Sequence, residues 1–175
     1  MTKKTSPKLK EIYKQLDNKD LSIQKKGVKA LRMHGDETSI PRLLDLLKDP
    51  SGPLYAEAFT VLCELKNSEA RAVLAGSIRK EVYSDRAKEI AAASWQTGYT
   101  GSDDLSHFVK AAIHSDYETA MECMTFIEQV EPPFNDAEVS ESLLLLNDYF
   151  DGEKDDKEPL LRSILAAVKL MYQRV

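Results

Sequence analysis

The chain has 175 residues, a formal net charge of −5 and 42% hydrophobic residues. That length suits one domain whose core needs neither disulfides nor a metal. No stretch approaches the roughly 18 apolar residues of a membrane span, and the charged start MTKKTSPKLK precedes no apolar run like that of a secretory signal. We therefore expect a cytoplasmic protein with no membrane partner.

Charge is unevenly distributed along the chain. Residues 1–35 carry ten Lys or Arg against three Asp or Glu, whereas residues 131–158 carry two against ten. The segment between them, 36–130, carries nine against sixteen. If the helices stack in chain order, one end is basic and the other acidic. This pattern leaves two possibilities open, a monomer or a weak head-to-tail self-association.

Apolar residues recur at helical spacing along the chain, interrupted by breakers such as 49–53 and Pro132-Pro133. The first helix begins at Ser6-Pro7, because serine can cap a helix and proline in the first turn has no amide to leave unbonded. No run alternates as a strand would. We predict a flexible N-terminus at 1–6 and a single domain over 7–175, with helices near 7–17, 20–33, 37–48, 54–65, 68–80, 85–96, 103–114, 117–130, 136–150 and 158–173.

An internal repeat organises these helices. ALRMHGDETSIPRLLDLLKDP (30–50) aligns with VLCELKNSEARAVLAGSIRKE (61–81) at a spacing of 31, which pairs Leu31 with Leu62 and Leu43 with Leu74. Residues 93–115 continue the pattern, and a fourth, weaker copy runs from 117 to about 150. Each copy is a longer helix, a polar turn and a shorter helix. Such a hairpin cannot bury both of its apolar faces alone, so we expect the copies to stack.

Segment 30–50 strongly resembles a HEAT repeat in its Gly-Asp turn, its Ile-Pro start of the second helix, its Leu-Leu-x-x-Leu core and its final Asp-Pro. HEAT units often carry an acidic residue in the turn and a basic one six positions later, and Asp36 with Arg42 and Asp104 with Lys110 share that spacing. The resemblance covers roughly residues 20–150. It implies an all-α fold, a right-handed α-α superhelix (an armadillo-like α-solenoid) of about four HEAT-like hairpins with a capping helix at each end.

No residue pattern in the chain supports catalysis. His34, His107 and His114 lie outside metal-binding patterns, and there is no His-Glu dipeptide of the kind through which HEAT-type hydroxylases bind iron. Cys63 and Cys123 have no nearby base, and we expect buried thiols in a reducing compartment. We therefore predict no enzyme, no catalytic residues, no cofactor and no metal.

A partner groove is expected on the shorter helices, which usually line the concave side of such solenoids. If the apolar stripes face inward, the outward residues form a floor of small side chains with basic residues along it. This floor suits an extended peptide or a helix with acidic flanks. The alternative is that tight curvature closes the groove. The candidate groove residues are Arg42, Asp45, Leu46, Ala75, Arg79, His107, Lys110 and His114.

The basic start of the chain supplies a second candidate surface. Its lysines could bind phosphate, but few aromatic residues accompany them and the rest of the chain is acidic. We therefore favour a solvated helix face, and after it an acidic protein partner, over nucleic acid. The candidate basic patch is Lys8, Lys10, Lys14, Lys25, Lys26 and Lys29.

The function that these features favour is a non-catalytic binding or scaffold module for another protein or peptide, with an acidic partner among the options. The alternatives come from the resemblance and from the basic start: an enzyme or enzyme subunit of HEAT architecture, similar to the bilin lyases, or a nucleic-acid accessory protein. A deep pocket with convergent polar side chains would favour an enzyme, and a shallow groove would favour a binding module.

Overall fold

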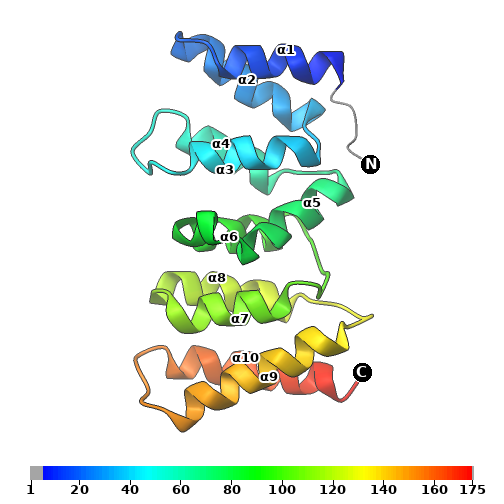
Figure 1. Cartoon of the computed structure of the whole chain (residues 1–175), viewed down its shortest axis with the longest axis vertical. Helices are drawn as coiled ribbons and strands as arrows, with labels where there is room; N and C mark the ends of the chain where they lie inside the picture. The colour runs from blue at the N-terminus through cyan, green and yellow to red at the C-terminus, as the bar shows by residue number, and fades with distance from the viewer. Residues whose placement is uncertain (1–5, 175) are drawn as a thin grey trace. The chain divides into compact units, whose positions relative to one another are not determined.

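A computed structural model describes residues 6–174, and within them the chain is all-helical (Figure 1). The all-α prediction is therefore confirmed. The chain forms two compact units, Met1–Leu74 and Ala75–Val175. The single domain predicted over 7–175 stays a prediction. The predicted flexible start lies outside the described residues, apart from Ser6. The α-helices are α1 (Pro7–Leu16), α2 (Leu21–His34), α3 (Ile40–Leu46), α4 (Tyr55–Cys63), α5 (Ser68–Ala75), α6 (Ala87–Gln96), α7 (Leu105–His114), α8 (Tyr117–Glu128), α9 (Asp136–Asp151) and α10 (Glu158–Tyr172).

Every predicted helical range overlaps one of these helices, and the differences lie at the ends. Three short 3₁₀ segments, η1 (Glu37–Ser39), η2 (Gly76–Arg79) and η3 (Glu81–Arg86), occupy places where a continuous α-helix or a loop is expected. At η1 the Asp36 carboxylate accepts from the Thr38 N–H at 2.9 Å, while the Asp36 N–H donates to Ser39 Oγ at 3.3 Å. This capping box favours a tight 3₁₀ turn before the α-helix.

In the first unit, α1 and α2 form a close pair. Ser6 Oγ accepts from the Leu9 N–H at 3.2 Å, so the predicted cap of α1 forms. Helix α2 crosses α1 at Gly27, where a Cβ would lie 3.1 Å from Gln15 Cβ and 3.1 Å from Leu16 Cδ2. A side chain there would push the two helices apart. Helix α4 packs against α2 and α3. The core contains Leu9, Ile12, Val28, Leu31, Ile40, Leu43, Leu44 and Leu62.

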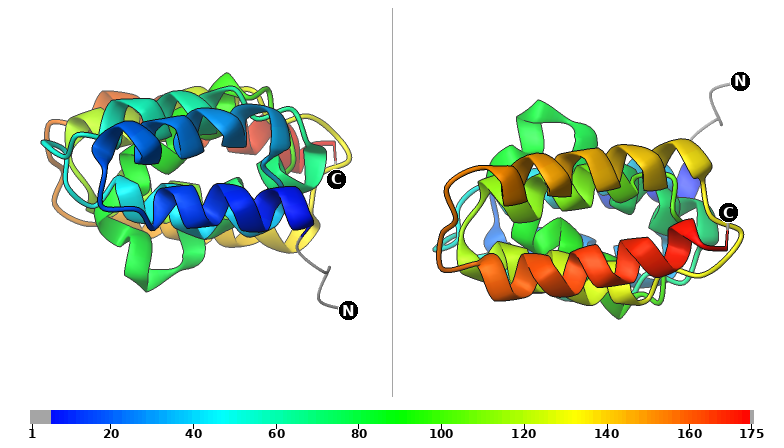
Figure 2. Two further views of the ribbon diagram at one scale, coloured as in Figure 1. Left: turned by 90° about the horizontal axis from the view of Figure 1, so that it is seen from above. Right: turned by 90° about the horizontal axis from the view of Figure 1, so that it is seen from below.

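In the second unit, helices contact neighbours one and two places along the chain. Helix α6 packs on α8, α7 packs on α8 and α9, and α10 packs on α8 and α9. Figure 2 shows two neighbouring pairs side by side, α1 with α2 in the left view and α9 with α10 in the right view. Phe108 of α7 stacks on Phe126 of α8 with ring centroids 3.9 Å apart. Gly98 ends α6 at a φ of +70°, a left-handed conformation that glycine adopts without strain.

The two cysteines differ in exposure. Cys123 is fully buried in α8, and burial raises the pKa of its thiol. Cys63, at the end of α4, is only half-buried, so the expectation of two buried thiols is correct for Cys123 alone. The reason is its position in the last turn of α4, beyond the buried stripe of that helix. No helix in residues 6–174 is long and apolar enough to cross a membrane.

Candidate functional site

The second unit contains a cleft of about 440 Å³ lined by η2, η3 and α7. It is strongly basic on a chain whose net charge is negative. The permanent cations are Arg79, Lys80 and Lys110, and Glu81 is the carboxylate in the lining. Two imidazoles, His107 and His114, join them. Four of the predicted groove residues thus lie around one hollow.

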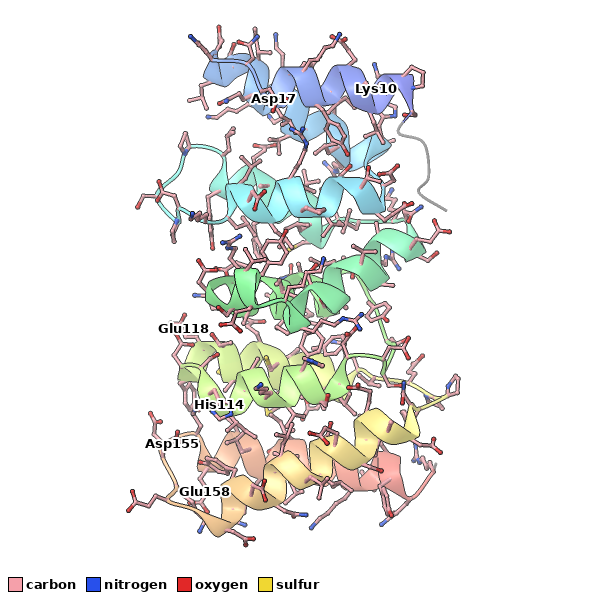
Figure 3. All side chains as sticks on the ribbon, viewed as in Figure 1. Lys10, Asp17, His114, Glu118, Asp155 and Glu158 are labelled. Atoms are coloured by element: carbon pink, nitrogen blue, oxygen red, sulfur yellow. The ribbon has the colours of Figure 1, made fainter. Side chains whose placement is uncertain are left out.

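Helix α7 provides one wall of this cleft because of its sequence periodicity. His107, Lys110 and His114 are spaced by three and four residues, so they share one face of the helix. The opposite face carries buried apolar side chains, including Phe108 and Val109. Figure 3 labels His114 at the end of this helix. Lys110 is exposed and, within residues 6–174, forms no ion pair, so its full charge is available to a ligand.

The opposite wall presents an arginine held in a set orientation. Arg79 Nε lies 3.0 Å from Asp104 Oδ1 and donates to the carbonyl oxygen of Gly76 at 3.1 Å. Its side chain remains 55% exposed. Gly76 makes room for this arrangement, since a Cβ there would lie 2.8 Å from Arg79 Nη2. The guanidinium is therefore positioned before any ligand arrives, which lowers the ordering cost of binding an anion.

Asp104 is the buried partner in this arrangement, with a side chain only 4% exposed. Burial raises the pKa of Asp104, and the positive charges of Arg79 and His107 oppose that rise. Because it lies behind the arginine, Asp104 is a positioning residue and does not line the cleft. Asp104 precedes Lys110 by six residues, the spacing that HEAT units often show, but its ion pair in the structure is with Arg79.

A serine, a histidine and a carboxylate meet beside the cleft without forming a nucleophilic triad. Ser106 Oγ donates to Glu138 Oε2 at 2.7 Å and lies 3.4 Å from His107 Nδ1. The single hydroxyl proton is committed to the carboxylate, and Ser106 is buried. Glu138 Oε2 also accepts from the Ser106 N–H at 2.9 Å. The carboxylate therefore caps the first turn of α7 and ties α9 to it.

Three predicted groove residues belong to the first unit. Arg42 Nη1 donates to Asp17 Oδ1 at 2.9 Å, and its guanidinium lies 4.5 Å from the centroid of the Tyr13 ring. Its charge is thus already engaged by α1. Asp45 and Leu46 line a separate hollow of about 630 Å³. The continuous groove through both units stays a prediction.

The prediction for Ala75 is wrong, because this residue is fully buried and cannot contact a partner. The expected helix over 68–80 treats the segment as one α-helix with a narrow inward stripe. Instead, α5 ends at Ala75 and the chain tightens into η2, and residues 75–77 are all buried. The change from 3.6 to 3.0 residues per turn alters which side chains point inward.

The six lysines of the predicted basic patch are all exposed, three on α1 and three on α2. Lys29 Nζ lies 3.8 Å from Glu57 Oε1 of α4, a long contact between exposed groups that is worth little. Figure 3 labels Lys10 on α1. The patch therefore exists as an exposed basic surface of the first unit.

Several residues that matter here carry no strong sequence signal. Lys80 and Glu81 line the cleft but fall at a predicted helix end. Lys157 falls between the helices predicted at 136–150 and 158–173, yet it is only 5% exposed and binds the end of α7. Only its position just before α10 could have hinted at a structural role. In the part of the chain that the structure describes, no three His, Cys, Asp or Glu side chains are arranged to hold a metal ion.

Comparison of the chain with protein-family models, curated proteins and solved structures gives no match.

Proposed function

We propose that this chain is a non-catalytic protein-binding module whose basic cleft in the second unit docks an acidic segment of a partner protein. The observation that carries the proposal is the concentration of Arg79, Lys80 and Lys110 with two imidazoles around one hollow of about 440 Å³. Oriented cations on a rigid helical wall suit side-chain carboxylates. Small residues such as Ala87 and Ala111 in the lining of the cleft leave room for a peptide backbone.

We further propose that the helices form a HEAT-like α-solenoid. Its support is the contact pattern inside each unit: α2 with α4 in the first, and α6 with α8 and α7 with α9 in the second. A helix that contacts its neighbours one and two places along is typical of hairpins stacked in chain order. A polar contact joins α1 to η1, the short turn that leads into α3, because Tyr13 Oη lies 3.0 Å from Ser39 Oγ.

A labelled peptide tests the binding function. The probe is a short fluorescein-labelled peptide of alternating Glu and Ala, and the readout is fluorescence anisotropy with the full chain. Lys110→Glu should weaken binding by about tenfold to a hundredfold, because it replaces an attraction with a repulsion. The same peptide with Gln in place of Glu should bind poorly.

Lys169→Glu is the matched control. It makes the same charge change on the exposed face of α10, outside the cleft lining. Binding by this variant should stay within about twofold of the original chain, since a distant exposed charge is largely screened. Equal affinities for the original chain and Lys110→Glu would refute the cleft as the docking site.

A further inference from the structure

Two exposed helix faces on this chain are complementary in charge. One lies on α2 and carries Ser22, Lys25, Lys26, Lys29 and Met33, which we call the basic face. The other lies on α9 and carries Ala137, Glu141, Leu144, Asp148 and Asp151, which we call the acidic face. The spacings of three and four residues place each set along one side of its helix.

Each face combines like charges with an exposed apolar residue. Met33 is 75% exposed and Leu144 is 60% exposed. Neither Lys25 nor Lys26 forms an ion pair within residues 6–174, and the same holds for Asp148 and Asp151. Apart from the long contact of 3.8 Å between Lys29 and Glu57, the charges of both faces are therefore unpaired in the described part of a single copy.

The two faces also match in register. When α2 is laid antiparallel to α9 with Met33 opposite Leu144, Lys29 comes opposite Asp148, because each lies four residues away. Lys26 then comes opposite Asp151, seven residues away on each helix. The same steps along the two helices give the same rises of about 6 Å and about 10.5 Å. One apolar contact and two charge pairs thus coincide.

We propose that the basic face of one copy docks on the acidic face of a second copy through this antiparallel register. The two faces are different surfaces, so the contact is heterologous. In a dimer, one copy keeps its acidic face free and the other copy keeps its basic face free. Association therefore continues past the dimer as concentration rises, unless it closes into a ring. Exposed charge pairs contribute little each, so the association is weak and sensitive to salt.

Sedimentation velocity of the concentrated full chain tests this proposal. The mean sedimentation coefficient should rise with protein concentration at roughly 20 mM salt and much less at roughly 500 mM, where the Debye length falls to about 4 Å. A monomer at every concentration and at both salts would overturn the proposal. Association that strengthens at high salt would overturn it too, since that dependence indicates an apolar contact.

Charge reversal tests the register. Lys26→Glu with Lys29→Glu makes both faces acidic, and Asp148→Lys with Asp151→Lys makes both faces basic. Each double variant alone should remain monomeric. An equal mixture should associate at least as strongly as the original chain, because the complementary faces are restored between unlike copies. A mixture that stays monomeric while the original chain associates would overturn the register.

The controls separate this contact from folding and from the cleft. Lys8→Glu with Lys169→Glu makes the same charge change outside both faces and should associate as the original chain does. Helical circular dichroism should be unchanged in all variants, since every substituted side chain is exposed. Lys110→Glu leaves both faces intact, so peptide binding and self-association can fail independently.

Discussion

The Nζ atom of Lys157 lies 2.6 Å from the carbonyl oxygen of Ile113, in the last turn of α7. The same ammonium donates to the carbonyls of Ala112 at 3.3 Å and Ser115 at 2.7 Å. Figure 3 labels Asp155, whose carboxylate lies 3.5 Å from this nitrogen. At the other end of α7, the Glu138 carboxylate binds the first turn. Helix α7 is therefore capped at both ends by charged residues far away in the sequence, each of the sign that its dipole favours.

Replacing Lys157 by Met should destabilise the folded chain. Methionine has a similar length but cannot donate, so three carbonyl oxygens that now share one buried ammonium would lose that partner. We expect the free energy of unfolding to fall by about 2–4 kcal/mol, measured by urea denaturation followed by circular dichroism. Lys154→Met in the same loop, where the side chain is exposed, should change it by less than about 0.5 kcal/mol. Similar midpoints for both variants would contradict this role for Lys157.

Gly76→Ala should weaken peptide binding. The new Cβ would lie 2.8 Å from Arg79 Nη2, so the flexible end of the arginine must move away from its place beside Asp104. Moving Arg79 leaves the buried Asp104 carboxylate without its cation, and this loss outweighs the better helix propensity of alanine, so the free energy of unfolding should fall by about 1–3 kcal/mol. Anisotropy with the Glu-Ala peptide should show a loss of about threefold to tenfold in affinity.

A double-mutant cycle decides whether Gly76 acts through Arg79. In an Arg79→Ala background, Gly76→Ala should have almost no further effect on peptide affinity, because the displaced group is already absent. Additive losses in the cycle would show that the glycine affects the cleft by another route.

Asp116→Ala should lower stability at neutral pH by about 1 kcal/mol, because Asp116 is the N-cap of α8 and accepts from the Thr119 N–H at 2.8 Å. Hydrogen bonds from the side chain and the backbone of Thr119 lower the pKa of Asp116 below its usual 3.8. A lowered pKa in the folded chain gives stability that is present above pH 3.8 and is lost as the pH falls through the folded value. The difference in the free energy of unfolding between the original chain and Asp116→Ala should therefore become smaller in acid.

Asp116→Asn provides the matching control for pH. Asparagine caps a helix about as well as aspartate but does not titrate. Urea midpoints for Asp116→Asn should be close to those of the original chain at neutral pH. The difference in the free energy of unfolding between Asp116→Asn and Asp116→Ala should not become smaller in acid. A gap between the original chain and Asp116→Ala that stays constant from neutral pH to about pH 3 would rule out the titrating cap.

Phe126→Ala should lower the free energy of unfolding by about 3–5 kcal/mol, because this ring is 1% exposed and stacks on Phe108. Tyr99 adds a parallel ring with its centroid 6.3 Å away. Phe126→Leu should lower the free energy of unfolding by less, since leucine fills much of the same volume. Phe134→Ala, at a half-exposed position, should cost well under half as much in the same denaturation experiment.

Local chemistry in the sequence predicts most of the secondary structure. Ser6 with Pro7 starts α1, and Pro132-Pro133 separates α8 from α9, because capping and the missing proline amide act within a few residues. The face of α7 that carries His107, Lys110 and His114 also follows from periodicity alone, since the buried stripe opposite it includes Phe108. Ala75 shows where periodicity fails, at a transition from α to 3₁₀ geometry.

By itself, then, the sequence determined that the chain is helical, where its helices lie and which residues of α7 point outward. Only the tertiary structure decided that Asp104 orients Arg79, that Glu138 and Lys157 cap the two ends of α7, and that Arg42 is engaged by Asp17. The physical reason is the sequence separation over which each kind of interaction acts. Caps and helical periodicity involve residues within a turn or two of one another, whereas these charge contacts join residues 25 or more positions apart that packing alone brings together.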